Sequence, residues 1–454
     1  MIQLINIKKM KVHILFLGLS IFSLHAVGQS FTLKQCIDYA QKNNGDIINA
    51  NYDIDIAQKR VNEEMGSMFP QIDASSAYTN NLKLNTTVLP GEILGQPGTN
   101  IAVQMGTQHN VSGGVQLSQK IFDPHFGTSL KATQLSKKQS ELALKQTTEQ
   151  IQYDISYLYY QTLVIKMQMN SLQVASNSSK ALMEATELRF KNGMAKQIDV
   201  DRIKVSHNNT RSQLNQIELS CKQSLNNLKY SIGMPVDSLI VLADSSFNIE
   251  IQELVLATNS SSFENRTDYQ LQKLALNSYE LEKKLNATGY LPSLSFNAYY
   301  GVNAMRDEFD FFNNGDWHPN SYIGLSLRIP VFDGMQRQSR IAQSKLEIEK
   351  SKVTINQFQE LIKVELSNSE IQYQNAIDNI QSEQANLNLA ESVLKSTQLQ
   401  YEQGTSSALD LVQAESSYRE SFNNYYNKLL NYYIAQINLE HSKGTLTEYL
   451  NNLK

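Results

Sequence analysis

Two aspartates stand at matching places in this chain, and their spacing suggests that they share a task. Asp199 follows Gly193 by six residues, and Asp410 follows Gly404 by six residues. A carboxylate near the start of a helix accepts hydrogen bonds from free backbone N–H groups, so both residues are consistent with helix caps. They are equally consistent with solvated positions on the outside of a helix.

Side chains that usually carry catalysis or bind metals are present but scattered. The seven histidines occur singly, and no string has the spacing of a zinc site, a nucleophile elbow or a phosphate-binding loop. Cys36 and Cys221 fall in different predicted helices, so we expect two separate buried thiols rather than a disulfide. The sequence therefore predicts no enzyme activity, no cofactor and no metal site.

The spacing around the two aspartates belongs to a longer internal repeat. Gly233 and Gly444 come forty residues after the first two glycines, and each closes a Leu-x-x-Ser-x-Gly string. Further upstream the matching strings are Phe122-Asp123 with Phe332-Asp333, and Phe69-Pro70 with Leu291-Pro292. The offset is 210 to 222 residues throughout. It indicates two structural repeats, each made of a helix, two strands, a very long helix and a long helix.

Two spans without proline predict the long helices. None of the eight prolines falls between 125 and 234, and none follows 330, whereas a proline inside a helix costs about 3 kcal/mol. Apolar residues seven apart, such as Ile151 and Leu158 or Tyr373 and Ile380, predict side-by-side packing as in coiled coils. A helix of about 65 residues is about 100 Å long. These helices should therefore extend as rods beyond a globular core.

Four segments show the two-residue period of strands. In one of them Ile323, Leu325 and Leu327 alternate with Gly324 and Ser326. Each run has about ten residues, the length of a tilted strand that crosses a bilayer with one face toward lipid. An ordinary half-buried sheet gives the same pattern.

Two segments between the strands, 82–109 and 304–320, are expected to be loops. The second contains four aromatic residues, which are Phe309, Phe311, Phe312 and Trp317. They could form an interfacial belt or pack as a cluster within the loop, and the packed cluster is the favoured interpretation.

The predicted organisation has five parts. The first is a signal peptide at 1–28, and the second is a repeat at 29–233, with strands at about 70–84 and 110–122 and long helices at about 125–191 and 197–232. A linker or equatorial segment at 234–266 follows. The second repeat is expected at 267–444, with strands at about 292–303 and 321–331 and long helices at about 335–402 and 408–442. A C-terminal tail occupies 445–454.

The first 28 residues have the features of a secretory signal. Lys8, Lys9 and Lys11 precede an apolar run, and small residues lie at the expected cleavage point. Removing these lysines changes the formal charge from −4 to −7, which disfavours nucleic acid as a partner. No window of 18 apolar residues follows, so a mature protein that spans a membrane would have to do so with strands.

Four strands leave two open edges, and an open edge in lipid costs several kcal/mol for each unpaired backbone group. The smallest known membrane barrels have eight strands. The chain must therefore share a barrel with copies of itself. Two copies would give a filled interior, whereas three would give twelve strands around a lumen.

Over nearly its whole length after residue 28, the chain resembles the TolC-like outer membrane efflux proteins. The strings that carry the resemblance are Phe31-Thr32-Leu33, Phe69-Pro70-Gln71, Leu291-Pro292-Ser293, Ile121-Phe122-Asp123, Val331-Phe332-Asp333, Arg189-Phe190-Lys191-Asn192-Gly193 and Tyr401-Glu402-Gln403-Gly404. The resemblance implies a homotrimer with a twelve-stranded barrel in the outer membrane and a long α-helical tunnel in the periplasm. It also implies a passive exit duct of a tripartite efflux pump or type I secretion system, which works with a periplasmic adaptor protein and an inner-membrane transporter.

The same resemblance implies a constriction at the periplasmic end of the tunnel. Tyr401, Asp410 and Asp199 match family residues that hold or ring this gate. Ser406 stands where the family has an arginine, and Gln413 stands where it has a second aspartate, so the family's salt-bridge latch is incomplete here.

Both helix turns resemble the sites at which the family meets its adaptor. The residues concerned are Asn192, Gly193, Met194, Gln403, Gly404 and Thr405. The alternative to a channel is a periplasmic or surface coiled-coil protein, such as an adhesin stalk, without channel activity.

Overall fold

The structure, a computed structural model, describes residues 30–95, 97–243, 263–312 and 315–453. The predicted signal peptide and positions 244–262 of the predicted linker lie outside the described residues. The chain divides into two compact units. Unit 1 combines the described parts of 1–49, 146–266 and 361–454, and unit 2 combines 50–145 with 267–360.

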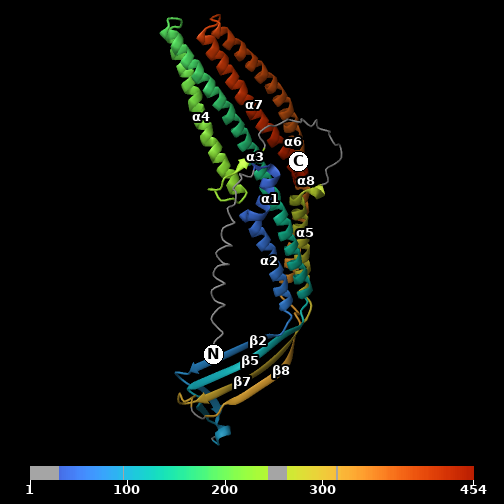
Figure 1. Ribbon diagram of the computed structural model, residues 1–454. Coiled ribbons are helices and arrows are strands. Elements are labelled where there is room, and N and C mark those ends of the chain that lie inside the picture. Colours follow the sequence, from blue (N-terminus) through green and yellow to red (C-terminus); the bar gives the residue numbers. More distant parts are fainter. Residues whose placement is uncertain (1–29, 96, 244–262, 313–314, 454) are drawn as a thin grey trace, which may run out of the picture. The chain divides into compact units, whose positions relative to one another are not determined.

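Most of the described residues are helical (Figure 1). The helices are α1 (Leu33–Asn43), α2 (Gly45–Gly66), α3 (Phe126–Lys191), α4 (Gln197–Ser231), α5 (Thr267–Thr288), α6 (Gln336–Glu402), α7 (Ala408–Lys443) and α8 (Leu446–Asn452). The two longest, α3 and α6, have 66 and 67 residues. Neither contains a proline, as the composition of these spans predicts. Among the described residues, no helix combines the length and the apolar character needed to cross a membrane.

The repeated Phe-Asp string starts each of the two longest helices. The Asp123 carboxylate accepts the His125 backbone N–H at 2.9 Å, just before α3. The Asp333 carboxylate accepts the Arg337 backbone N–H at 3.0 Å, and its oxygen also lies 2.8 Å from Arg337 Nε in an ion pair. Free N–H groups at a helix start need such acceptors.

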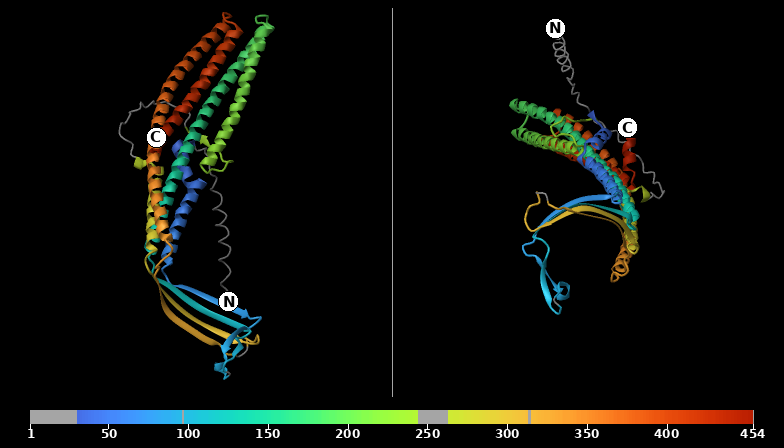
Figure 2. Two further views of the ribbon diagram at one scale, coloured as in Figure 1. Left: turned by 180° about the vertical axis from the view of Figure 1, so that it is seen from behind. Right: turned by 90° about the horizontal axis from the view of Figure 1, so that it is seen from below.

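Unit 2 contains an antiparallel sheet of four strands, which the view from below in Figure 2 shows to be curved. Its strands are β2 (Gln71–Asn80), β5 (His109–Phe122), β7 (Ser293–Arg306) and β8 (His318–Arg328), in the order β2-β5-β7-β8. The sheet thus joins strands of both repeats. Strands β2 and β8 have one neighbour each and form its open edges.

The segment 82–109, for which the sequence predicts a loop, has a different structure. It forms a separate hairpin of β3 (Asn85–Pro90) and β4 (Asn100–Met105), with the short helix η1 (Gly91–Leu94) between them. Strand β2 ends at Asn80 rather than at 84, because the next residue already belongs to the base of this extension. The six-residue strands are too short to give a clear two-residue period in the sequence.

The aromatic residues of the segment 304–320 pack as a cluster, as favoured in the sequence analysis. Phe309 lies edge-on to Phe311 and to Tyr78 of β2, with ring centroids 5.5 Å apart in each pair. Arg306 lies over the Phe311 ring at 5.1 Å. Phe309 also lies edge-on to His109, the first residue of β5, so the cluster covers the ends of β2 and β5 within unit 2.

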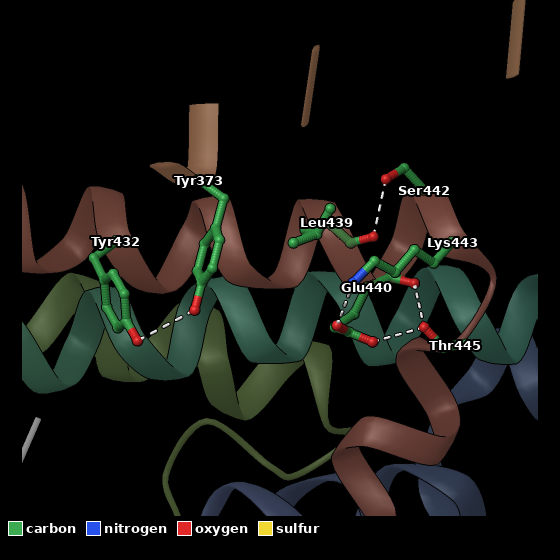
Figure 3. Close-up of polar contacts among 7 residues, drawn as sticks. All are labelled: Tyr373, Tyr432, Leu439, Glu440, Ser442, Lys443 and Thr445. Carbon is green, nitrogen blue, oxygen red and sulfur yellow. Dashed lines mark hydrogen bonds and ion pairs between the residues drawn. The ribbon is translucent and has the colours of Figure 1, made fainter. Parts of the chain in front are cut away.

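The segment 445–454, predicted as a C-terminal tail, contains α8. Leu446 and Leu450 are buried, and Thr447 donates a hydrogen bond of 2.7 Å to Gln152 of α3. Figure 3 shows the turn before this helix, where Thr445 donates to the Glu440 carboxylate at 2.6 Å. These contacts fix the chain end within unit 1.

The first predicted helix is broken into α1 and α2 at Asn44. The Asn44 side chain accepts the Asp46 N–H at 2.8 Å and donates to the Ser231 carbonyl at 2.8 Å. Similarly Arg266, the last residue of the predicted linker, donates to the Ser442 carbonyl at 3.4 Å. The serines of the two Leu-x-x-Ser-x-Gly strings therefore have the same role. The carbonyl of each accepts a hydrogen bond from a side chain that directly precedes a helix, Asn44 before α2 and Arg266 before α5.

The core of unit 1 is made by apolar side chains of the long helices. Fully buried members are Ile155, Tyr159, Leu163, Ile203, Leu228, Leu411 and Leu429. A two-stranded parallel pairing of β1 (Ser30–Phe31) with β6 (Val241–Leu242) and the short helix η2 (Phe263–Asn265) complete the described elements. Cys36 and Cys221 are both buried and are not joined by a disulfide, as expected.

Candidate gate and membrane-facing sheet

The two turns that connect the long helices of unit 1 lie at the same end of its helices, as Figure 2 shows. Gly193 and Gly404 both adopt a left-handed backbone, with φ of 75° and 77°. This conformation favours glycine and closes the ends of α3 and α6. The side chain of Met194 is 73% exposed at the first turn. Residues 403–405 of the second turn are exposed as well.

Tyr401 is buried next to the second turn. Its hydroxyl lies 3.3 Å from the Thr186 hydroxyl of α3. Its ring belongs to a small apolar cluster with Ile203, Ala408 and Leu411. The residue therefore joins the end of α6 to α3 and α4.

Asp410 caps the start of α7. Its carboxylate accepts the Ser407 backbone N–H at 3.0 Å and the Ser407 hydroxyl at 2.7 Å, and its own N–H donates to that hydroxyl. These hydrogen bonds lower the pKa of Asp410, and the one from the Ser407 side chain has the largest effect. The carboxylate is therefore ionised at neutral pH.

Asp199 occupies the corresponding place at the start of α4. Its carboxylate accepts the Lys196 backbone N–H at 3.4 Å. The structure thus gives both aspartates a capping contact, one of the two interpretations that the sequence left open. A carboxylate that caps a helix still carries its negative charge, so the capping contact is compatible with a second role as a pore-lining residue.

A shallow groove runs between α6 and α7, and it contains Asp410 together with Gln413. Glu383 of α6 and Glu420 of α7 also line it. Three carboxylates therefore face one groove, which gives this side of the helix pair an acidic character.

Polar side chains that the sequence analysis missed cross between the repeats on the opposite side of α7. Ser206 of α4 donates to the Glu415 carboxylate at 2.9 Å. Arg419 donates to the Thr210 hydroxyl at 2.6 Å. Ser206 and Thr210 are four residues apart on α4, as are Glu415 and Arg419 on α7, so both hydrogen bonds lie along one line of contact between these helices. The spacing within each helix can be read from the sequence, but the sequence does not show that the two helices are neighbours.

The four-stranded sheet has one apolar and one polar face. The register places on the apolar face Ile72, Ala74 and Tyr78 of β2, Val111, Val115 and Leu117 of β5, Phe296, Ala298 and Tyr300 of β7, and Ile323, Leu325 and Leu327 of β8. The opposite face carries Asp73, Ser75 and Thr79, Ser112, Gln116 and Ser118, Asn297, Tyr299 and Asn303, and Asn320, Tyr322 and Ser326.

This apolar face is exposed in the single chain. Ile323 is 80% exposed and Leu325 is 71% exposed. Apolar surfaces of this extent on a folded chain mark a contact with protein or lipid. A sheet that is apolar on one side and polar on the other fits the boundary between lipid and water.

The repeated strings next to the strands also expose apolar side chains. Phe69 and Phe332 are 66% and 79% exposed, and Val331 is 92% exposed. Aromatic and apolar side chains at the ends of membrane strands are typical of the interface between lipid and water.

The model of the family described as outer membrane efflux protein matches residues 36–234 and 260–445. Among curated relatives, the outer membrane protein TolC of Escherichia coli is 19% identical over 96% of this chain and 86% of its own length. The Vibrio cholerae TolC is also 19% identical, over 96% of this chain and 95% of its own length.

Solved structures of similar fold include two outer membrane channels. The Campylobacter jejuni CmeC channel matches with a TM-score of 0.72 at 17% identity, over 93% of this chain and 90% of that chain. The open state of the Neisseria gonorrhoeae MtrE channel matches with a TM-score of 0.69 at 16% identity, over 91% and 89%. The chain therefore belongs to the outer membrane efflux protein family, a family of outer-membrane channels and not of enzymes.

Proposed function

We propose that the protein is a passive exit channel of a tripartite efflux pump or a type I secretion system. Three copies would combine their four-stranded sheets into one twelve-stranded barrel, and their long helices would form the periplasmic tunnel below it. The observation that carries this proposal is the sheet itself. It has an exposed apolar face, a polar face and two open edges, β2 and β8. In lipid these edges need partners, and copies of the same sheet can supply them.

The gate is proposed at the turn-bearing ends of the helices. Tyr401 would hold α6 against α3 in the closed state, through its buried ring and its hydrogen bond to Thr186. Asp410, Asp199 and Gln413 would line the constriction. Because Ser406 and Gln413 stand where an arginine and an aspartate complete the family latch, the closed state needs other contacts.

The exposed turns are proposed as docking sites for a periplasmic adaptor protein. The first includes Asn192, Gly193 and Met194, and the second includes Gln403, Gly404 and Thr405. Through this adaptor the channel would be joined to an inner-membrane transporter, which supplies the energy.

The direct test is ion conductance of purified protein in a planar bilayer. We expect discrete channel events, with a preference for cations that falls in an Asp410→Asn variant, because the substitution removes a carboxylate from the proposed constriction. Gln413→Ala, which removes no charge, serves as the matched control. Absence of conductance, both in the native protein and in a double variant with Asp199→Asn and Asp410→Asn, would contradict channel function.

A further inference from the structure

Arg189 lies in the last turn of α3 and binds the end of α6. Its guanidinium donates to the Tyr401 carbonyl at 3.3 Å and to the Glu402 carbonyl at 3.0 Å. The same group lies over the Tyr401 ring, 5.5 Å from the ring centroid. One side chain of the first repeat therefore makes three contacts with the last two residues of a second-repeat helix.

These contacts are of the kinds that hold helix ends strongly. Carbonyls at the end of a helix lack partners within the helix and carry partial negative charge, so a cation bound there is stabilised. Hydrogen bonds from a guanidinium are charge-assisted and stronger than neutral ones. Thr186, three residues before Arg189 on the same face of α3, holds the Tyr401 hydroxyl. Two side chains of α3 thus bind Tyr401, Thr186 at its hydroxyl and Arg189 at its backbone carbonyl.

The second repeat has no arginine at the position that matches Arg189. When the repeats are aligned on Gly193 and Gly404, the position of Arg189 corresponds to Gln400. The second turn carries no cation of its own, because Ser406 stands two residues after its glycine. Arg189 is therefore the arginine that links the end of α3 to the end of α6, next to the two turns.

We propose that Arg189 is the gate-holding residue of this chain. It keeps the α6–α7 pair against the α3–α4 pair in the closed state, and its release from the two carbonyls accompanies opening. The proposal rests on the proposed channel function. It assigns to the first repeat the latch that the second-repeat turn lacks.

The test compares single-channel recordings of purified native protein with those of the Arg189→Gln variant. Glutamine is the residue at the matching place of the second repeat, so it suits a helix at this position. Loss of two charge-assisted hydrogen bonds and of the cation–ring contact should raise the ratio of open to closed time about tenfold or more. Arg189→Lys, which keeps the charge but not the fork, should give an intermediate value.

Lys191→Met is the matched control, because it removes one exposed positive charge from the same turn without touching α6. It should conduct as the native protein does. The melting temperature of each assembled variant separates a gating role from a merely structural one, since the proposal expects conductance to change in variants that remain assembled.

Each remaining outcome decides the question. If the native protein conducts and Arg189→Gln matches both it and Lys191→Met, the proposal is overturned while channel function stands. If neither the native protein nor any variant conducts, channel function itself fails. Failure of both Arg189→Gln and Arg189→Lys to assemble would assign Arg189 to the fold, and this too would overturn the proposal.

Discussion

The glycines of the repeat have two different tasks at the scale of single residues. Gly193 and Gly233 share a left-handed backbone with φ of 75°. A Cβ atom on Gly193 would meet nothing within 4 Å, whereas one on Gly233 would clash with the Asn43 carbonyl oxygen. Gly193 therefore serves only the turn, while Gly233 also admits the backbone between α1 and α2.

An alanine at each position should separate these tasks. Both substitutions carry the cost of a left-handed alanine, about 1–2 kcal/mol. Gly233→Ala must in addition displace the backbone at Asn43, so we expect it to lower the melting temperature clearly more than Gly193→Ala does. Circular dichroism melts of the two purified variants give the comparison, and equal melting temperatures would contradict the close approach.

Glu415 should make stability depend on pH. Burial raises its pKa above the ordinary glutamate value, and the Ser206 hydrogen bond and Arg419 only partly oppose this. Because the folded carboxyl binds its proton more tightly than the unfolded one, its contribution favours the folded state at low pH. That contribution is lost as the pH rises from about 4.5 through the raised folded value.

The Glu415→Gln variant removes the titrating group and keeps an oxygen that can accept from Ser206. We expect its thermal stability to fall less with rising pH than that of the native protein, over a series of melts upward from pH 4.5. Glu420→Gln, on the exposed side of the same helix, is the control and should keep the native profile. Identical slopes for the native protein and Glu415→Gln would show that the carboxyl is not buried as described.

At the scale of elements, the two faces of β8 offer a test within adjacent residues. Leu325 lies on the apolar face and Ser326 on the polar face of the same strand. A lysine on the lipid side of a membrane strand costs up to about 2–4 kcal/mol near the middle of the bilayer, whereas one facing water costs little. We expect Leu325→Lys to reduce the amount of protein in the outer-membrane fraction, and Ser326→Lys to leave it near the native level. Equal loss in both variants would contradict the assignment of the faces.

The fold class follows from the sequence because its signals are long. Spans of over a hundred residues without proline specify the long helices, and ten-residue alternation specifies the four main strands, so this part of the prediction is confirmed. Short elements were missed, namely the β3–β4 hairpin, the break at Asn44 and α8. Each is fixed by tertiary contacts, such as the Asn44 bond to Ser231, rather than by a local period.

The candidate gate was only partly visible in the sequence. The repeat drew attention to Tyr401 and Asp410, and the structure places both next to the second turn, although their roles in a gate remain predictions. Thr186, Arg189 and Ser206 were not recognised as partners. Their contacts join residues more than 200 positions apart, and no spacing in the sequence reports such a distance.

At the scale of the whole molecule, the single chain is incomplete as an outer-membrane protein. Its apolar sheet face is exposed, and the β2 and β8 edges each lack a neighbour among the described strands. Pairing β8 of one copy with β2 of the next would satisfy both edges and close the sheet after a whole number of copies. Three copies give twelve strands, enough for a lumen, whereas two give eight, whose interior is filled by side chains.

The most direct measurement is therefore the mass of the particle extracted from the outer membrane in mild detergent, determined by native mass spectrometry. We expect three chains in each particle. A particle that contains one or two chains, stable under the same conditions, would contradict it, because neither could surround a water-filled passage with these four strands per chain.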